Sequence, residues 1–335
     1  MTSTADTPPS CNDDAPRPAR GGTGGATYSE LRAQLETLTT EAFRSELSEI
    51  DRLPTLEIAR IMSGEDSTVP AAVADQLPQI ASAIDGIAER MARGGRLIYA
   101  GAGTAGRLGV LDASECPPTF NTDPADVVGL IAGGPAAVST SVEGAEDSKE
   151  LAAADLDGLQ LTADDTVVGI SASGRTPYAV GAVEYARNTH GSFTVGLSCN
   201  ADSPLGGAAA QPIEVVVGPE LLTGSTRLKA GTAQKLVLNM LSTITMIRLG
   251  KTFGNLMVDV RASNEKLRAR SRRIVSLATG ADDETIEAAL TQADDEVKNA
   301  ILIILAGVDG RTAAKLLADA DGHLRDAIRT ATGEG

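Results

Sequence analysis

The stretch RLIYAGAGTAGR at residues 96–107 decides the fold of this chain. It opens with the apolar run LIYA and passes directly into a GxGxxG pattern formed by Gly101, Gly103 and Gly106. A short continuous apolar run is typical of a strand that is buried on both faces of a parallel sheet. The glycines indicate a tight turn into a helix, at which backbone N–H groups can approach an anion closely.

Four further short apolar runs follow the first, at residues 127–131, 166–170, 193–197 and 213–217. Ala-rich stretches with helical spacing, such as residues 177–188, lie between several of them, and residues 71–92 show the same spacing before the first. Buried strands that alternate with helices predict an α/β fold, with a doubly wound five-stranded parallel sheet in an αβα sandwich.

Residues 232–249 form a predicted helix that is apolar nearly all round, so it must be buried in the domain or against a second subunit. Beyond residue 255 the chain has only helical patterns. We therefore expect three parts: a disordered tail at residues 1–27, N-terminal helices plus the sheet domain at 28–255, and a small all-helical domain at 256–335.

The composition limits the partners of the protein. The formal net charge is −16 over 335 residues, and Lys and Arg are scattered without a basic face, so nucleic acid is not an expected partner. No uninterrupted apolar window of about 18 residues exists, and the first 27 residues lack the apolar core of a signal peptide, so no membrane span is expected. An anionic ligand must then be held locally, by N–H groups, hydroxyls and a few cations.

Cysteine and histidine are too sparse for a disulfide framework or a metal site. The chain has three Cys and two His, far apart and without a zinc-ligand spacing. We expect a cytoplasmic protein with no metal and no cofactor.

The GxGxxG loop alone leaves three interpretations open. A dinucleotide site would also need an acidic residue at the end of the next strand, where this chain has IAGG at residues 131–134. NAD binding is therefore disfavoured. Close approach of the backbone to another anion is favoured over a turn that is merely tight.

A second loop, SASGRTP at residues 171–177, follows the third predicted strand. Ser171, Ser173 and Thr176 supply three hydroxyls just before a helix that opens with Pro177, a favoured first-turn residue. One hydroxyl, that of Thr176, is expected to cap the helix, but capping does not need three. The loop therefore predicts a phosphate site.

Together the two loops resemble the sugar isomerase (SIS) domain, which binds phosphosugars at strand ends. Four longer motifs narrow the resemblance to the N-acetylmuramic acid 6-phosphate etherases: LDASECPPTF at 111–120, VEGAEDS at 142–148, TGSTRLKAGTAQK at 223–235 and GNLMVDV at 254–260. The likeness extends from about residue 50 to the C-terminus.

The resemblance implies cleavage of the lactyl ether of N-acetylmuramate 6-phosphate by elimination and hydration, with Glu115 and Glu146 as the functional glutamates. A carboxylate can remove the proton next to an aldehyde, and a carboxylic acid can protonate the departing lactate oxygen. Which glutamate removes the carbon-bound proton stays open. We expect Pro117 and Pro118 to force the chain out of helix and hold Glu115 in a cleft. The resemblance to dimeric SIS enzymes, together with the apolar helix at residues 232–249, also implies a homodimer.

The predicted binding residues gather in the two loops and in the third motif. They are Gly103, Thr104, Gly106, Ser171, Ser173, Arg175, Thr176 and Lys229. The chain departs from the family where Ala105 replaces the usual Ser, and where the segment TEAFR at residues 40–44 lacks the usual Asn. Two other functions remain possible on this fold: a sugar-phosphate-binding regulator such as the glucokinase regulatory protein, and an aldose–ketose isomerase.

Overall fold

The computed structural model describes residue 35 and residues 37–260 and 265–333, so the predicted tail at residues 1–27 lies outside the described residues. The chain divides into two units between Thr37 and Leu38. The second unit contains the sheet and all the helices described here.

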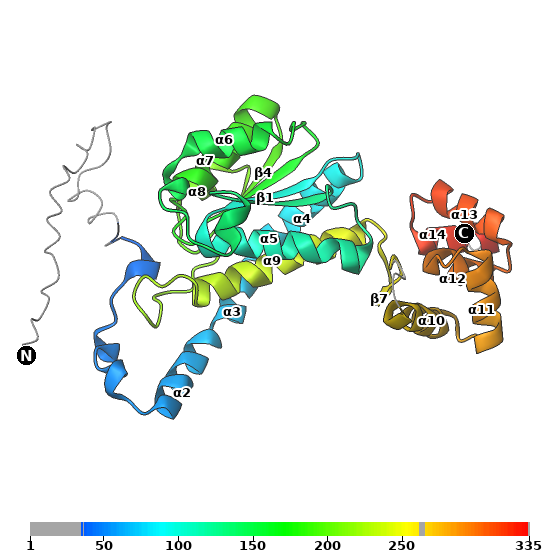
Figure 1. Ribbon diagram of the computed structural model, residues 1–335, viewed down its shortest axis with the longest axis horizontal. Helices are drawn as coiled ribbons and strands as arrows, with labels where there is room; N and C mark the ends of the chain where they lie inside the picture. Colours follow the sequence, from blue (N-terminus) through cyan, green and yellow to red (C-terminus); the bar gives the residue numbers. More distant parts are fainter. Residues whose placement is uncertain (1–34, 36, 261–264, 334–335) are drawn as a thin grey trace, which may run out of the picture. The chain divides into compact units, whose positions relative to one another are not determined.

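Five parallel strands form the central sheet, in the order β2-β1-β3-β4-β5, which confirms the predicted sheet (Figure 1). Their bounds are β1 (Leu97–Gly101), β2 (Val127–Ile131), β3 (Thr166–Ile170), β4 (Phe193–Ser198) and β5 (Gln211–Glu214). Strand β5 begins two residues before the run that predicted it and contains Pro212, which an edge strand tolerates because one side of it needs no partner.

Helices cover both faces of the sheet. Successive side chains of β1 alternate between two cores: Leu97 and Tyr99 belong to one, Ile98 and Ala100 to the other. The first core includes residues of α3 (Val69–Ala74), α4 (Leu77–Met91), α5 (Gly103–Phe120) and α9 (Lys229–Arg248). The second core includes residues of α6 (Lys149–Asp157) and α7 (Pro177–Tyr185), and α8 (Pro204–Ala208) packs with α7.

Two predicted helices are interrupted. Residues 71–92 form two helices, α3 and α4, because Pro78 in the first turn of α4 has no N–H group to continue the earlier helix. The expected N-terminal helices are also not continuous, since Thr39–Glu41 and Ser45–Leu47 are separate 3₁₀ turns. Helix α2 (Thr55–Asp66) follows and contains no buried residue.

The C-terminal region has a core of its own. After a two-stranded antiparallel hairpin, which the helical prediction missed, the chain forms five helices that pack around buried residues such as Ile301 and Leu302. The elements are β6 (Thr252–Phe253), β7 (Leu256–Met257), α10 (Glu265–Thr279), α11 (Asp283–Gln292), α12 (Val297–Ala306), α13 (Gly310–Asp319) and α14 (Leu324–Thr332). This separate core supports the domain boundary that we propose near residue 256.

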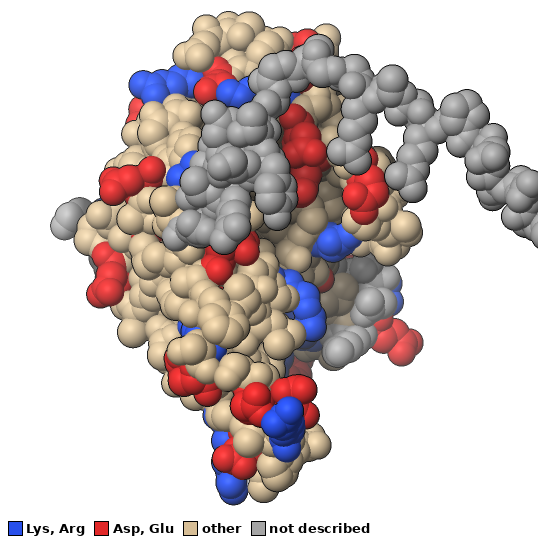
Figure 2. Space-filling view, turned by 90° about the vertical axis from the view of Figure 1, so that its left-hand side faces the viewer, with Lys and Arg blue, Asp and Glu red and all other residues tan. Residues whose placement is uncertain are grey.

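Charged side chains of both signs lie on the surface. On the face shown in Figure 2, Lys and Arg form small groups between acidic residues. Within the described ranges, no helix is long and apolar enough to cross a membrane.

Candidate active site

A cavity of about 290 Å³ lies at the carboxyl ends of β1 and β3, which is where ligands bind in open α/β sheets. Its wall combines the loops after these strands with the region before and within α9 and with two acidic side chains from elsewhere. The lining residues are Glu41, Ala102, Gly103, Thr104, Ala105, Glu146, Ser171, Ala172, Ser173, Thr176, Thr226 and Gln234.

The loop after β1 presents a free helix start to the cavity. Gly103 begins α5 with φ +54°, and a side chain on Gly106 would meet the Gly101 carbonyl oxygen at 2.6 Å, so both glycines are required by the backbone. Ala102, which precedes the helix, has no side chain that can cap it. The first N–H groups of α5 are therefore available to an anion.

The loop after β3 is organised by its hydroxyls. Ser171 Oγ lies 2.8 Å from Thr176 Oγ1 and accepts a hydrogen bond from Gly174 N at 3.0 Å, and Ser173 Oγ accepts one from Arg175 N at 3.2 Å. The expected capping role of Thr176 is wrong, because its hydroxyl bonds to Ser171 and the start of α7 has no side-chain cap. A second uncapped helix start thus lies at the cavity.

Glu146 reaches the cavity from a 3₁₀ turn, Ala145–Asp147, rather than from a solvated helix face. It also lines an adjoining cavity of about 140 Å³, together with Arg107, whose guanidinium donates to the Val138 carbonyl oxygen at 2.9 Å. Glu146 therefore lines the same cavity as the candidate phosphate loops in this single chain.

Glu115 does not line this cavity. Helix α5 continues through Pro117 and Pro118 to Phe120, so the expected exit from helix is wrong. The helix is held there by burial of Cys116 and Phe120 in the first core, which outweighs two lost hydrogen bonds in its last turns. Glu115 is exposed and roughly 18 Å along the helix axis from Gly103, at 1.5 Å per residue.

Three other predicted binding residues do not line the cavity. Gly106 is buried behind it, and Arg175 is exposed outside it. Lys229 is buried, and its ammonium bonds to Glu65 at 2.8 Å. Glu65 also pairs with Arg44 at 2.5 Å, so Lys229 belongs to an ion-pair cluster and not to the cavity lining.

The structure adds three polar residues that the sequence did not single out: Glu41, Thr226 and Gln234. Thr226 and Gln234 fall within the TGSTRLKAGTAQK motif, so the motif carried a signal for them. Glu41 falls in the segment to which the sequence assigned no role.

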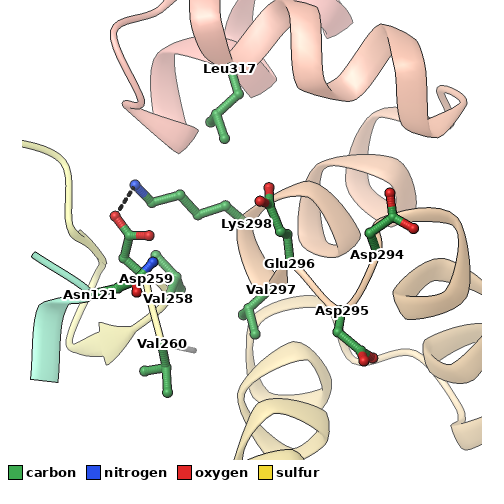
Figure 3. A pocket seen from close by; sticks show the side chains of 10 residues that line it. All are labelled: Asn121, Val258, Asp259, Val260, Asp294, Asp295, Glu296, Val297, Lys298 and Leu317. Atoms are coloured by element: carbon green, nitrogen blue, oxygen red, sulfur yellow. Dashed lines mark hydrogen bonds and ion pairs between the residues drawn. The ribbon is translucent and has the colours of Figure 1, made fainter. Parts of the chain in front are cut away.

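A larger cavity of about 500 Å³ contains none of the predicted site residues. Figure 3 shows its lining, in which the Asp259 and Lys298 side chains point toward one another and bond at 3.0 Å. Asp259 also pairs with Lys251 at 3.0 Å, so its charge is neutralised within the protein.

The sheet order, the hydroxyl loop after β3 and the uncapped helix starts define a SIS-type phosphosugar-binding domain. Residues 79–187 match the family model of the glucokinase regulatory protein N-terminal SIS domain. An N-acetylmuramic acid 6-phosphate etherase of Streptomyces avermitilis is 79% identical over 304 residues, which are 91% of this chain and 97% of that protein. The chain belongs to the N-acetylmuramic acid 6-phosphate etherase family.

Two further comparisons have lower sequence identity. The Mycolicibacterium smegmatis protein of the same name is 55% identical over 294 residues, 88% of this chain and 98% of its own length. Among solved structures, a Bacteroides fragilis protein described as a phosphosugar isomerase is 22% identical, covers 58% of this chain and 91% of its own, and has a TM-score of 0.45.

Proposed function

We propose that this chain is a carbon–oxygen lyase that cleaves the lactyl ether of N-acetylmuramate 6-phosphate, giving N-acetylglucosamine 6-phosphate and D-lactate. One observation carries the proposal beyond family membership: Glu146 lines the same cavity as the hydroxyl loop and the uncapped start of α5. A phosphate anchor and a proton-transfer group within one cavity are what an elimination on a phosphosugar requires.

The phosphate is bound at the strand ends, by the hydroxyls of Ser171, Ser173 and Thr176 and by N–H groups at the starts of α5 and α7. Opening of the sugar ring to the aldehyde acidifies the hydrogen on the second carbon, which a carboxylate removes. The departing lactate oxygen takes a proton, and water then adds to the unsaturated aldehyde. One C–O bond breaks as lactate leaves and another forms as water adds, with no net oxidation or reduction, so the proposal includes no redox cofactor.

Glu115 is the second proposed catalytic residue, and its position supports a homodimer. It is much farther from the loops along α5 than the length of a sugar phosphate. Exposed apolar side chains lie on the two helices that pack together here: Leu111 is 50% exposed on α5, and Ile244 and Ile247 are 38% and 45% exposed on α9. A second copy that covers this apolar surface would bring Glu115 of one copy to the cavity of the other.

Mixing two inactive variants tests this shared site. Glu115→Gln and Glu146→Gln enzymes should regain about one quarter of wild-type activity after subunit exchange, because about half of the dimers are mixed and each mixed dimer has one intact site of two. If both glutamates served within one chain, mixing would restore nothing. Light scattering that showed only a 34.3 kDa species at micromolar concentration would contradict the dimer itself.

Incubation with N-acetylmuramate 6-phosphate tests the reaction. D-lactate should appear together with N-acetylglucosamine 6-phosphate. Binding without lactate release would favour a regulatory protein, and turnover of a ketose phosphate without lactate would favour an isomerase.

We place the enzyme in the cytoplasm, where its two described free thiols, Cys116 and Cys199, would stay reduced. Burial raises the pKa of each thiol to about 12.

A further inference from the structure

We propose that Glu41 is a substrate-binding residue that accepts hydrogen bonds from the hydroxyl or amide groups of the sugar. Its half-buried side chain lines the cavity with Thr104, Ser173 and Glu146. No residue role implied by the family resemblance includes it. The inference rests on the proposed function, because it concerns the same cavity and the same substrate.

The backbone that carries Glu41 is fastened on its N-terminal side. We call residues 38–44 the strap. Asn200, which follows β4, accepts from Thr39 N and from Thr39 Oγ1, both at 2.9 Å. The amide nitrogen of Asn200 donates to Thr40 Oγ1 at 3.1 Å and to the Ala172 carbonyl oxygen at 3.0 Å. One buried amide therefore joins the strap to the hydroxyl loop, since Ala172 lies between Ser171 and Ser173.

The other end of the strap is fastened by charge. Arg44 donates to Glu65 at 2.5 Å, and Glu65 also accepts from Lys229, the first residue of α9, at 2.8 Å. Lys229, foremost, and Arg44 hold the pKa of Glu65 below its ordinary value. Between the two attachments the 3₁₀ turn Thr39–Glu41 fixes the direction in which Glu41 leaves the backbone.

The Glu41 carboxylate also packs on the loop before α9. An added side chain on Gly224 would lie 2.6 Å from a carboxylate oxygen of Glu41, so this oxygen rests directly on the glycine. Glu41 is half-buried at the cavity wall, and hydrogen bonds and an ion pair hold the backbone on either side of it. This arrangement is typical of a preorganised binding group rather than of a solvated surface acid.

Charge decides which part of the substrate Glu41 contacts. The phosphate and the lactyl carboxylate are both anions, and a carboxylate repels them at short range. The remaining groups of the sugar, its hydroxyls and its amide N–H, are donors, and a carboxylate is a strong acceptor for them. Glu41 therefore binds the sugar ring and orients it between the phosphate loops and Glu146.

The experiment compares three constants in the wild-type enzyme and in Glu41→Gln. The variant keeps the size of the side chain but loses its charge, so the KM for N-acetylmuramate 6-phosphate should rise about tenfold or more, with kcat changed much less. The inhibition constant of N-acetylglucosamine 6-phosphate should rise by the same factor. The inhibition constant of inorganic phosphate should stay the same or fall, because a nearby negative charge is gone.

The matched control is Glu49→Gln, which makes the same charge change close to the strap at a side chain that is 64% exposed and pairs only with Arg52 among the described contacts. An unchanged KM in Glu41→Gln, a loss confined to kcat, or an equal weakening of inorganic phosphate would each overturn the proposal. The last result would mean that Glu41 only supports the phosphate loops.

Releasing the strap gives a second variant. Arg44→Met removes the ion pair with Glu65 but keeps the Glu41 side chain itself. It should therefore raise KM by a smaller factor than Glu41→Gln and leave inhibition by inorganic phosphate unchanged. A wild-type KM in Arg44→Met would contradict the positioning role of the strap. If the wild-type enzyme released no lactate, the proposed function would fail, and calorimetric binding of N-acetylglucosamine 6-phosphate by both proteins would still decide the role of Glu41.

Discussion

Helix α9 and the pair α5 and α7 all begin near the cavity, yet their first N–H groups have different partners. In α9, the N–H groups of Lys229 and Ala230 donate to the buried carboxylate of Glu220, at 2.9 and 3.0 Å. In α5 and α7 no side chain caps the start. The protein therefore supplies an anion of its own to one helix and leaves two helices without one.

The free and occupied helix starts indicate where a ligand anion can bind. A free helix start attracts negative charge, whereas an occupied one offers neither N–H groups nor unneutralised dipole. The phosphate should thus bind between α5 and α7, and Lys229 at the start of α9 belongs to the scaffold.

The largest effect should come from the carboxylate on the α5 and α7 side. Glu146→Gln cannot cycle a proton, so lactate release should fall by at least about 10²-fold while the KM changes little. If Glu146 is the carbon base, the variant should also lose solvent-deuterium exchange at the second carbon. Release of lactate at the wild-type rate would remove Glu146 from the chemistry.

Removing the built-in anion of α9 should be the next largest effect. Glu220→Gln loses two charge-assisted hydrogen bonds in a fully buried place, so the free energy of unfolding should fall by about 1.5–3 kcal/mol. Urea unfolding measures it, with Glu49→Gln as the control that should match the wild type. A Glu220→Gln protein of wild-type stability would show that α9 does not need the anion.

Substitution of Ser173 in the phosphate loop should have a smaller effect. Ser173→Ala removes one of several phosphate contacts, so the KM should rise roughly tenfold or less, and kcat should change little because phosphate is bound equally in the ground and transition states. Ser67→Ala, an exposed hydroxyl that bonds only to the Gly64 carbonyl oxygen among the described contacts, is the control. An unchanged KM would place the phosphate away from this loop.

The smallest effect concerns Glu65, which neutralises Lys229. Because Lys229 and Arg44 lower the folded-state pKa of Glu65, its stabilisation is fully present above the ordinary glutamate pKa of about 4.3 and is lost as pH falls through the lowered value. Glu65→Gln should therefore be less stable than the wild type at pH 7, and the difference should shrink below about pH 4. Urea unfolding at both pH values checks this, and a difference that grew on acidification would contradict it.

The sheet could be predicted because each strand is a local apolar run. The runs at residues 127–131 and 166–170 coincide with β2 and β3, and the glycines after β1 placed the start of α5. The loop at residues 171–177 was found for the same reason, since its hydroxyls and Pro177 are neighbours in the chain. Patterns formed by neighbouring residues can predict local structure without knowledge of the rest of the fold.

The rest depends on contacts between distant residues. Thr39 bonds to Asn200, which is 161 residues away in the chain, and this contact holds the neighbouring Glu41 at the cavity. No local sequence pattern encodes such a contact. Lys229 was predicted as a phosphate ligand, but it pairs with Glu65 and does not line the cavity. Pro117 and Pro118 predicted a break, but burial of their neighbours Cys116 and Phe120 keeps α5 helical.

The cavity wall has a consequence for the effect of salt on the enzyme. Among its lining residues in the described part of the chain there is no Lys or Arg, and the whole protein carries a formal charge of −16. A trianionic sugar must therefore diffuse toward a surface that repels it, without a cationic funnel to draw it in. Moderate ionic strength shortens the range of that repulsion. Capture of substrate, measured as kcat/KM, should speed up as salt is added, the reverse of enzymes that attract anions with basic residues.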